Sequence, residues 1–207
     1  MARGTTGLAA AWVLSCAPLV LPALWPEIAL SFGEAPRWAL AALPWIAWLG
    51  LPGRSGSGTL VNAALAAPPI AAGLGSELSR GGDPSRLSIQ ACAAIGMILA
   101  LAAAADLAAR VPARARAYAL AWLALVPGAP LLALCLGLGG APTYGEPADW
   151  LVLVARASPL GWIAGRASPS AGEGPVLADA LVPVGACLVL LAIAGFGASA
   201  RRGEGSS

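Results

Sequence analysis

The stretch SIQACAAIGMILALAAAADLAARVPARARAY, residues 88–118, decides the fold of this chain. Residues 88–109 are almost entirely apolar, and three arginines then follow between positions 110 and 116. An α-helix crosses the hydrocarbon core of a bilayer with about 20 mostly apolar residues. Arginine is costly at the bilayer centre and gathers in the loops between spans. The stretch therefore predicts a transmembrane helix that ends at a basic loop.

The composition extends this prediction to the whole chain. Its 207 residues are 58% hydrophobic and 11% charged, whereas a soluble domain is about 45–50% apolar and about 25% charged. All 12 basic residues are arginines, and the net charge is only +2. With no basic stripe interleaved with aromatic residues, we expect no nucleic-acid partner. We predict one membrane domain over residues 1–200 and a disordered polar tail over residues 201–207.

Five further apolar segments are candidates for spans. Residues 118–140 and 176–198 are long and mostly apolar, as a spanning helix requires. Residues 7–25 are also long enough but contain two prolines that predict a kink. Residues 38–51 are short, and residues 59–75 contain a proline pair and make the most doubtful span. A cleaved signal peptide is less favoured, because the first apolar run continues well past the 7–15 residues of a signal core. We expect an all-α, polytopic transmembrane bundle of about six spans, within a range of five to seven.

Residues 150–165, WLVLVARASPLGWIAG, differ in kind from these spans. Arg156 lies in the middle of the apolar run, and Ser158-Pro159 is typical of a helix N-cap followed by proline at the first helical position. This pattern predicts a short re-entrant or interfacial helix pair before the last span. Two prolines also break the span at 118–140. The break is either a kink packed against neighbouring helices or part of a transport pathway, because broken membrane helices often line one. The candidate pathway or gate residues are Pro127, Pro130, Arg156, Ser158, Pro159 and Trp162.

The arginines also predict an orientation. With six crossings, seven arginines fall on the side of both termini and five on the other side. The densest group, at positions 110–116, falls on the same side as the pair Arg201-Arg202. The positive-inside rule then places both termini in the cytoplasm. The Ala- and Arg-rich, lysine-free composition is typical of a GC-rich bacterial genome, so we expect the chain in a bacterial inner membrane. Trp25, Trp38 and Trp150 lie near span ends, where an aromatic belt is expected.

The residue types also limit the chemistry. The chain has no histidine, which excludes histidine-based metal sites and Ser-His or Cys-His catalysis. The four cysteines lie in four different apolar runs without a CxxC pair, and we interpret them as packing residues. Asp106 and Arg110 are four residues apart, which predicts an ion pair at a helix end rather than a proton relay. We expect no enzymatic activity, no cofactor and no metal.

Three stretches resemble ABC-2-type permeases of the haem-exporter-like kind. They are RSGSGTLVNAALAAPP (54–69), ARARAYALAWLALVPGAPLLAL (113–134) and ADWLVLVARASPLGWIAGRAS (148–168). The resemblance implies six spans, an external re-entrant helix pair between spans five and six, a homodimer, and a separate ATP-binding subunit, since this chain has no P-loop. The cytoplasmic contacts with that partner would then be Arg54, Arg110, Arg114 and Arg116. The alternative is a non-transporting membrane scaffold or assembly factor whose partner is the lipid bilayer.

Overall fold

The structure is a computed structural model that describes residues 2–24, 36–49, 59–138, 157–166 and 176–195. Within these ranges every regular element is a helix and no strand is present. The elements are α1 (Ala2–Leu24), α3 (Arg37–Leu49), α4 (Thr59–Ser79), α5 (Pro84–Ala109), α6 (Pro112–Leu123), the π-helical turn η1 (Ala124–Gly128), α7 (Ala129–Leu138), α9 (Pro159–Arg166) and α10 (Val176–Gly195). The predicted all-α fold class is therefore confirmed for the described residues.

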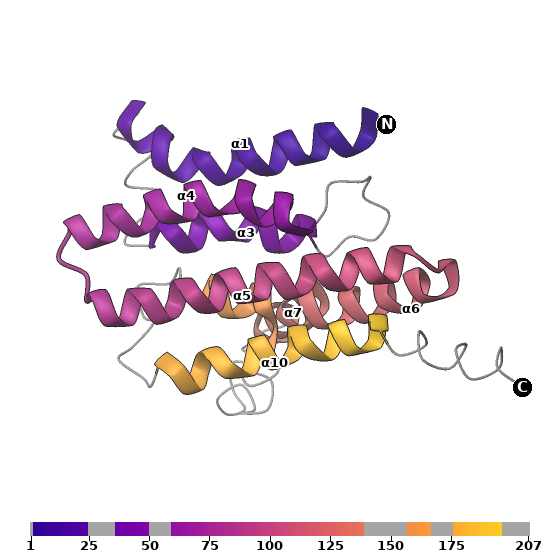
Figure 1. Ribbon diagram of the computed structural model, residues 1–207. Coiled ribbons are helices and arrows are strands. Elements are labelled where there is room, and N and C mark those ends of the chain that lie inside the picture. The colour runs from indigo at the N-terminus through magenta and orange to yellow at the C-terminus, as the bar shows by residue number, and fades with distance from the viewer. Residues whose placement is uncertain (1, 25–35, 50–58, 139–156, 167–175, 196–207) are drawn as a thin grey trace, which may run out of the picture.

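The long helices lie side by side with alternating directions (Figure 1). Helix α5 is central, with α10 packed most extensively against one side and α3 and α4 on the other, while α1 covers α3 and α4 from outside. The start of α1, the α5–α6 turn and the end of α10 lie at one end of the bundle, and the α4–α5 turn lies at the other (Figure 1). All six segments that the hydropathy singled out are helical where they are described. The number of membrane crossings stays a prediction.

The α4–α5 turn is fixed by local chemistry. Gly81 has a φ of +87°, a left-handed conformation that glycine adopts without steric cost. Asp83 then caps α5, because its carboxylate accepts a hydrogen bond from the Ser85 backbone N–H at 3.0 Å, and Pro84 occupies the first helical position. These residues reverse the chain and begin the longest helix at a defined position.

Small side chains allow the helices to approach closely. In α5, the buried residues include Ala94, Ala102, Ala105 and Ala108, and α10 is the helix that packs most extensively against α5. Between α3 and α4, a Cβ added at Gly73 would lie 2.6 Å from the backbone N and Cα of Trp38, so only glycine fits there. Larger side chains fill the remaining interior, and Trp38, Trp45, Tyr118 and Met97 are fully buried.

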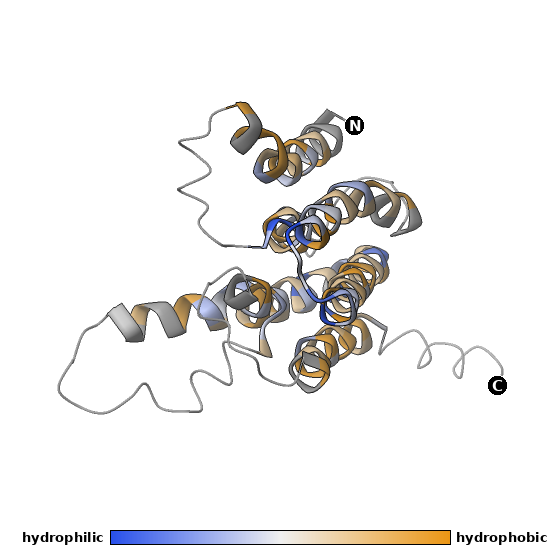
Figure 2. Cartoon of the chain, turned by 90° about the vertical axis from the view of Figure 1, so that its left-hand side faces the viewer, coloured by the Kyte–Doolittle hydropathy of each residue, from blue (hydrophilic) through white to orange (hydrophobic). Residues whose placement is uncertain are grey.

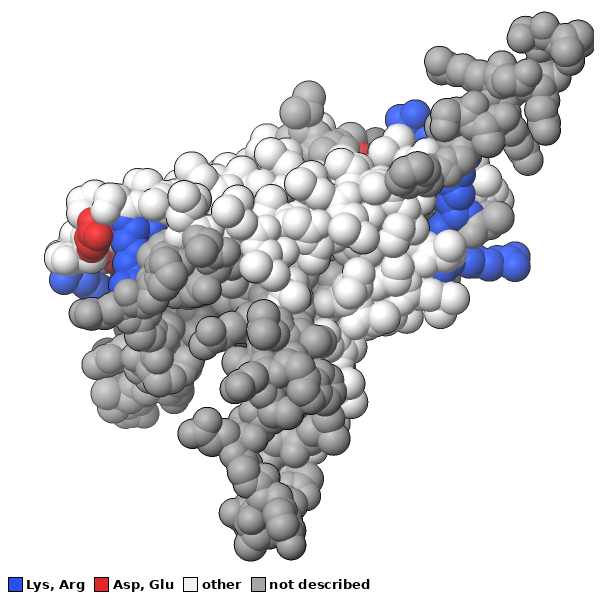
Figure 3. Space-filling view, turned by 90° about the horizontal axis from the view of Figure 1, so that it is seen from below, with Lys and Arg blue, Asp and Glu red and all other residues white. Residues whose placement is uncertain are grey.

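The outer surface of the helices is mostly apolar. Figure 2 shows hydrophobic residues along the helices and hydrophilic ones at the α4–α5 turn. The space-filling view from below shows the described charged side chains gathered toward the two ends, with an uncharged surface between them (Figure 3). Two helical stretches, Pro84–Ala109 and Arg114–Leu132, are long and apolar enough to cross a membrane. Gly7–Leu21 and Ala180–Gly195 are apolar but shorter. This distribution favours a membrane location.

One expectation about the tryptophans is wrong. Trp38 lies near the start of α3, but it is completely buried and so does not form part of an exposed aromatic belt. The close approach of α4 at Gly73 covers its backbone, and the ring packs against another helix. Trp25 and Trp150 lie outside the described residues, as do Arg54, Arg156 and the tail at 201–207.

Candidate functional site

The candidate site begins at the broken helix that runs from α6 through η1 to α7. Pro127 has no backbone N–H and cannot continue the regular hydrogen-bond pattern of α6. The helix widens into a π-helical turn here, and the Ala129 N–H bonds to the Ala124 carbonyl five residues earlier. A Cβ added at Gly128 would lie 2.6 Å from the Leu123 carbonyl oxygen, so the glycine is required by the bulge. Bulges of this kind occur often at functional sites.

The second proline leaves a specific carbonyl without its helical donor. In a regular helix the Val126 carbonyl accepts a hydrogen bond from the N–H four residues later, but that residue is Pro130. The Ser158 hydroxyl donates to this carbonyl at 2.6 Å instead, and both residues are buried. A buried carbonyl without a partner is costly. Ser158 therefore repairs, from another part of the chain, the gap that Pro130 creates.

Ser158 also starts helix α9. The Gly161 N–H donates to the Ser158 hydroxyl at 3.3 Å, and the Trp162 N–H donates to the Ser158 carbonyl at 2.8 Å. Pro159 is the first residue of the helix. The predicted N-cap followed by proline is therefore confirmed. One hydroxyl thus joins the broken helix to the first turn of α9.

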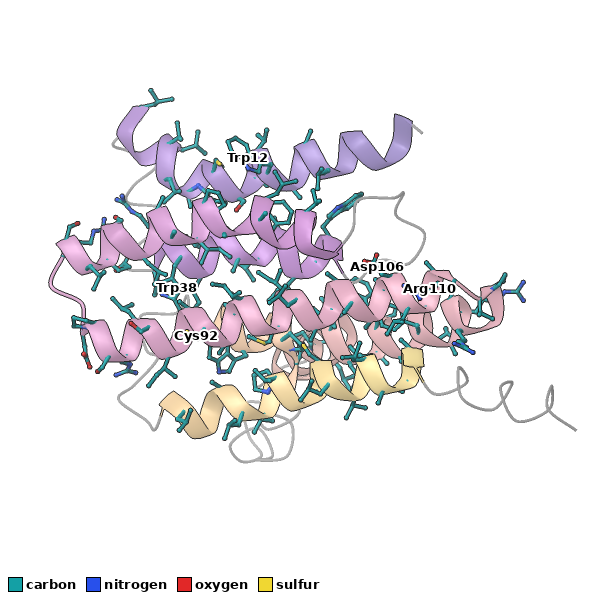
Figure 4. The ribbon with its side chains drawn as sticks, in the orientation of Figure 1. Trp12, Trp38, Cys92, Asp106 and Arg110 are labelled. Carbon is teal, nitrogen blue, oxygen red and sulfur yellow. The ribbon has the colours of Figure 1, made fainter. Side chains whose placement is uncertain are left out.

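Helix α9 is held on its other side by α3. The rings of Trp162 and Trp38 have centroids 6.3 Å apart and are tilted by 54°, a favourable aromatic arrangement. Figure 4 shows Trp38 between α3 and α5. The indole N–H of Trp38 is buried and has no hydrogen-bond partner among the described residues, and the same is true of Trp122 in α6. Buried indole donors normally find an acceptor.

The structure brings together most of the residues that the sequence pointed to. Pro127 follows Val126 directly and Pro130 lies four residues after it, in the segment η1–α7 that contacts α9, and Ser158 donates to the Val126 carbonyl. Pro159 and Trp162 follow Ser158 in α9. Arg156 lies outside the described residues. Sequence reasoning missed Trp38, because its place near a span end looked interfacial. Arg37 precedes Trp38 in RWALAALPWIAWL and the residues after it are apolar, so no local signal distinguished a buried ring from an interfacial one.

Three of the predicted cytoplasmic contacts, Arg110, Arg114 and Arg116, form a second group at the α5–α6 turn. Arg110 follows the last residue of α5, and Arg114 and Arg116 lie in the first two turns of α6. Arg110 and Arg116 are exposed, and Arg114 is half-buried. Asp106 lies one turn before Arg110 on α5 (Figure 4). The ion pair predicted between these two residues stays a prediction.

The far end of the bundle is more evenly charged. Glu77, near the end of α4, accepts a hydrogen bond from the backbone N–H of Arg37 at 3.2 Å and so caps the start of α3. The Arg37 guanidinium donates to the Ser76 hydroxyl at 3.2 Å, and Arg80 lies 3.7 Å from the Glu77 carboxylate. Hydrogen bonds from the Ser85 hydroxyl and backbone hold the pKa of Asp83 below its ordinary value.

Comparison of the chain with protein-family models, curated proteins and solved structures finds no match. The relation to ABC-2-type permeases therefore stays a prediction from the three sequence stretches. Among the described residues, no group of three or more cysteine or acidic side chains is placed to hold a metal ion.

Proposed function

We propose that this chain is an integral membrane protein that forms the permease-like subunit of a transporter energised by a separate ATP-binding subunit. The membrane location is supported by the contrast between the two longest apolar stretches. In the most apolar part of Pro84–Ala109, half of the residues are buried inside the bundle, as in any core helix. In the most apolar part of Arg114–Leu132, only 17% are buried. Exposing such a helix to water costs about 25 cal/mol for each Å² of apolar surface. Lipid removes that cost.

The dimensions of the bundle support the same location. Helix α5 has 26 residues and is therefore about 39 Å long, which matches a hydrocarbon core of about 30 Å with part of the interfacial regions. The described arginines at the α5–α6 turn and those at the α4–α5 turn stand at opposite ends of this helix. Six helices with alternating directions would place both termini on one side.

The observation that carries the transport proposal is the hydrogen bond from the Ser158 hydroxyl to the Val126 carbonyl. In a membrane, broken helices are tolerated where other helices or water satisfy the freed backbone groups. Here a single hydroxyl on the short helix α9 does so. If α9 moves away, the Val126 carbonyl must bind water or a substrate group. Opening of this junction and hydration of the broken helix are then one event, as a gate requires.

The energy for opening has to come from a partner, because the sequence contains no P-loop. In this scheme two copies of the chain enclose the pathway, and the ATP-binding subunits act on the end that carries Arg110. Alternating exposure of the pathway follows from movement of α9 against the broken helix. The residues placed at the gate are Pro127, Pro130, Ser158, Pro159 and Trp162, with Arg156 predicted to precede them.

The first experiment identifies the partner. The tagged chain is purified in a mild detergent from its own organism and the co-purifying proteins are identified by mass spectrometry. We expect an ATP-binding subunit without a membrane part of its own, together with ATP hydrolysis in the purified material. A preparation with no such subunit, and with no flux of any tested solute in proteoliposomes, overturns the transport proposal and leaves the scaffold or assembly factor as the conclusion.

The second experiment tests the topology. In a variant whose four native cysteines are replaced, single cysteines are introduced as Arg80→Cys and Arg114→Cys and labelled with a membrane-impermeant maleimide. These sites lie at opposite ends of the central helix, so we expect them to be labelled from opposite sides. Labelling of both from the same side contradicts the proposed crossing of α5.

A further inference from the structure

The two ends of the bundle differ in how their charges are balanced. Around the α5–α6 turn, Arg110, Arg114 and Arg116 are accompanied by one carboxylate, Asp106, within the described residues 84–138. The first turn of α6 contains no acidic residue, although the positive end of a helix dipole favours one. At the other end, Arg37, Arg80 and Arg86 are accompanied by two carboxylates, Glu77 and Asp83. The excess of positive charge among the described residues is therefore larger at the α5–α6 turn.

The same helix presents exposed leucines directly beside the arginines. Arg116, Leu120 and Leu123 are spaced by four and three residues and so share one face of α6. Leu120 is 69% exposed and Leu123 is 52% exposed. Leu131 and Leu132 continue the exposed apolar surface along α7. This face is charged at its start and apolar over the rest of its length.

The spacing along this face matches the layers of a bilayer. Arg116 and Leu120 are separated by about 6 Å along the helix axis. The polar interfacial region on each side of a bilayer is about 5–8 Å thick. With the Arg116 guanidinium at the level of the headgroups, Leu120 lies at the boundary of the hydrocarbon and Leu123 lies within it.

We infer that the α5–α6 end of the bundle is a binding surface for an anionic phospholipid, with Arg116, Leu120 and Leu123 on one face of α6 and Arg110 and Arg114 at the same end. Guanidinium groups bind phosphate oxygens in a bidentate manner, and the acyl chains lie along the leucines. Because Leu120 and Leu123 on the same face lie at the level of the acyl chains, we assign the neighbouring Arg116 guanidinium to a lipid headgroup rather than to an acidic protein surface. The inference rests on the proposed membrane location but not on transport or on an ATP-binding subunit.

The test measures the preference of the protein for an anionic lipid. The purified chain is placed in mixed micelles with equal amounts of phosphatidylglycerol and phosphatidylcholine, and the bound lipids are counted by native mass spectrometry. We expect phosphatidylglycerol to be enriched in the wild-type protein. Since a basic residue near an anionic surface contributes about a fivefold preference, the double variant Arg114→Gln/Arg116→Gln should reduce this enrichment by about tenfold or more.

The matched control removes the same charge at the other end, with Arg80→Gln/Arg86→Gln, and should leave the enrichment unchanged. Equal enrichment in wild type and in Arg114→Gln/Arg116→Gln overturns the inference, and so does an equal loss in the control, which would show a response to net charge alone. If Arg114→Gln/Arg116→Gln keeps the lipid but loses a co-purifying ATP-binding subunit, the arginines contact that protein instead. Release of the chain from membranes by alkaline carbonate would contradict the membrane location itself.

Discussion

Two places in the bundle combine a proline inside a helix with a serine from a different part of the chain. In α3, which contains Pro44, the Ala41 carbonyl accepts a hydrogen bond of 2.6 Å from the hydroxyl of Ser15 in α1. In the broken helix, the Val126 carbonyl accepts one of the same length from Ser158. Both serines and both carbonyls are buried. The two sites look alike, but their backbones differ in one respect.

The difference lies in the residue four positions after each carbonyl. Ala41 is followed by Trp45, which has a backbone N–H, whereas Val126 is followed by Pro130, which has none. The helix can therefore satisfy the Ala41 carbonyl by itself, and Ser15 adds a second bond while accepting one from the Trp45 indole at 3.0 Å. The Val126 carbonyl lacks this donor four residues later, and the Ser158 hydroxyl donates to it. A contact that supplements a helix holds two helices together, whereas a contact that replaces a missing bond makes the helix depend on its neighbour.

The largest effect is expected from Ser158→Ala. This change leaves the buried Val126 carbonyl without a donor and removes the N-cap of α9, losses of about 1–3 and about 1 kcal/mol. We expect the free energy of unfolding to fall by about 2–4 kcal/mol in total. The measurement is reversible unfolding in mixed detergent and dodecyl sulfate micelles. Ser158→Thr retains the hydroxyl and serves as the control. If both variants lose the same stability, the hydroxyl is not what holds α9.

A double-mutant cycle tests the role of Pro130 directly. Pro130→Ala returns an N–H to the position that can serve the Val126 carbonyl, so Ser158→Ala should cost less in that background. We expect a coupling free energy of about 1–3 kcal/mol between the two positions. The matching cycle of Pro44→Ala and Ser15→Ala should give about 0.5 kcal/mol or less, because Pro44 withholds its N–H from Leu40 and not from Ala41. Equal coupling in the two cycles would remove the distinction between the sites.

A smaller loss is expected from Ser15→Ala. The Ala41 carbonyl keeps its helical donor, so the main cost is the buried Trp45 indole N–H, about 1–2 kcal/mol. The variant is compared with Ser158→Ala in unfolding and, once a substrate is known, in transport. If the chain transports as proposed, Ser15→Ala should keep transport in proportion to the protein that remains folded. Loss of transport by a fully folded Ser15→Ala protein would show that the α1–α3 contact also takes part in gating.

The contrast also shows what a sequence of this kind reveals. The apolar runs predict the helices, and the pair Ser158-Pro159 predicts the start of α9, because both signals are local. The missing donor at Val126 follows from Pro130 by counting four residues. That Ser158 supplies the replacement cannot be read in this way, since it depends on how segments 32 residues apart pack. The burial of Trp38 is equally non-local, because it follows from Gly73 and Trp162.

The weakest effect is expected at the exposed counterpart of the Ser158 cap. Asp83-Pro84 begins α5 as Ser158-Pro159 begins α9, but Asp83 lies in solvent, and water can replace the hydrogen bonds it accepts. Its pKa is lowered from the ordinary 3.8 by the Ser85 hydroxyl and backbone N–H. A depressed carboxyl pKa means that the cap contributes fully above pH 3.8 and loses its contribution as the pH falls through the lowered value. We expect the Asp83 carboxyl carbon, followed by NMR in micelles, to titrate below pH 3.8 and to shift toward that value in Ser85→Ala. The rest of the bundle should keep its fold over the pH range in which Asp83 titrates, whereas loss of the buried Ser158 cap destabilises α9. Unfolding of α9 in step with the Asp83 titration would contradict this expectation.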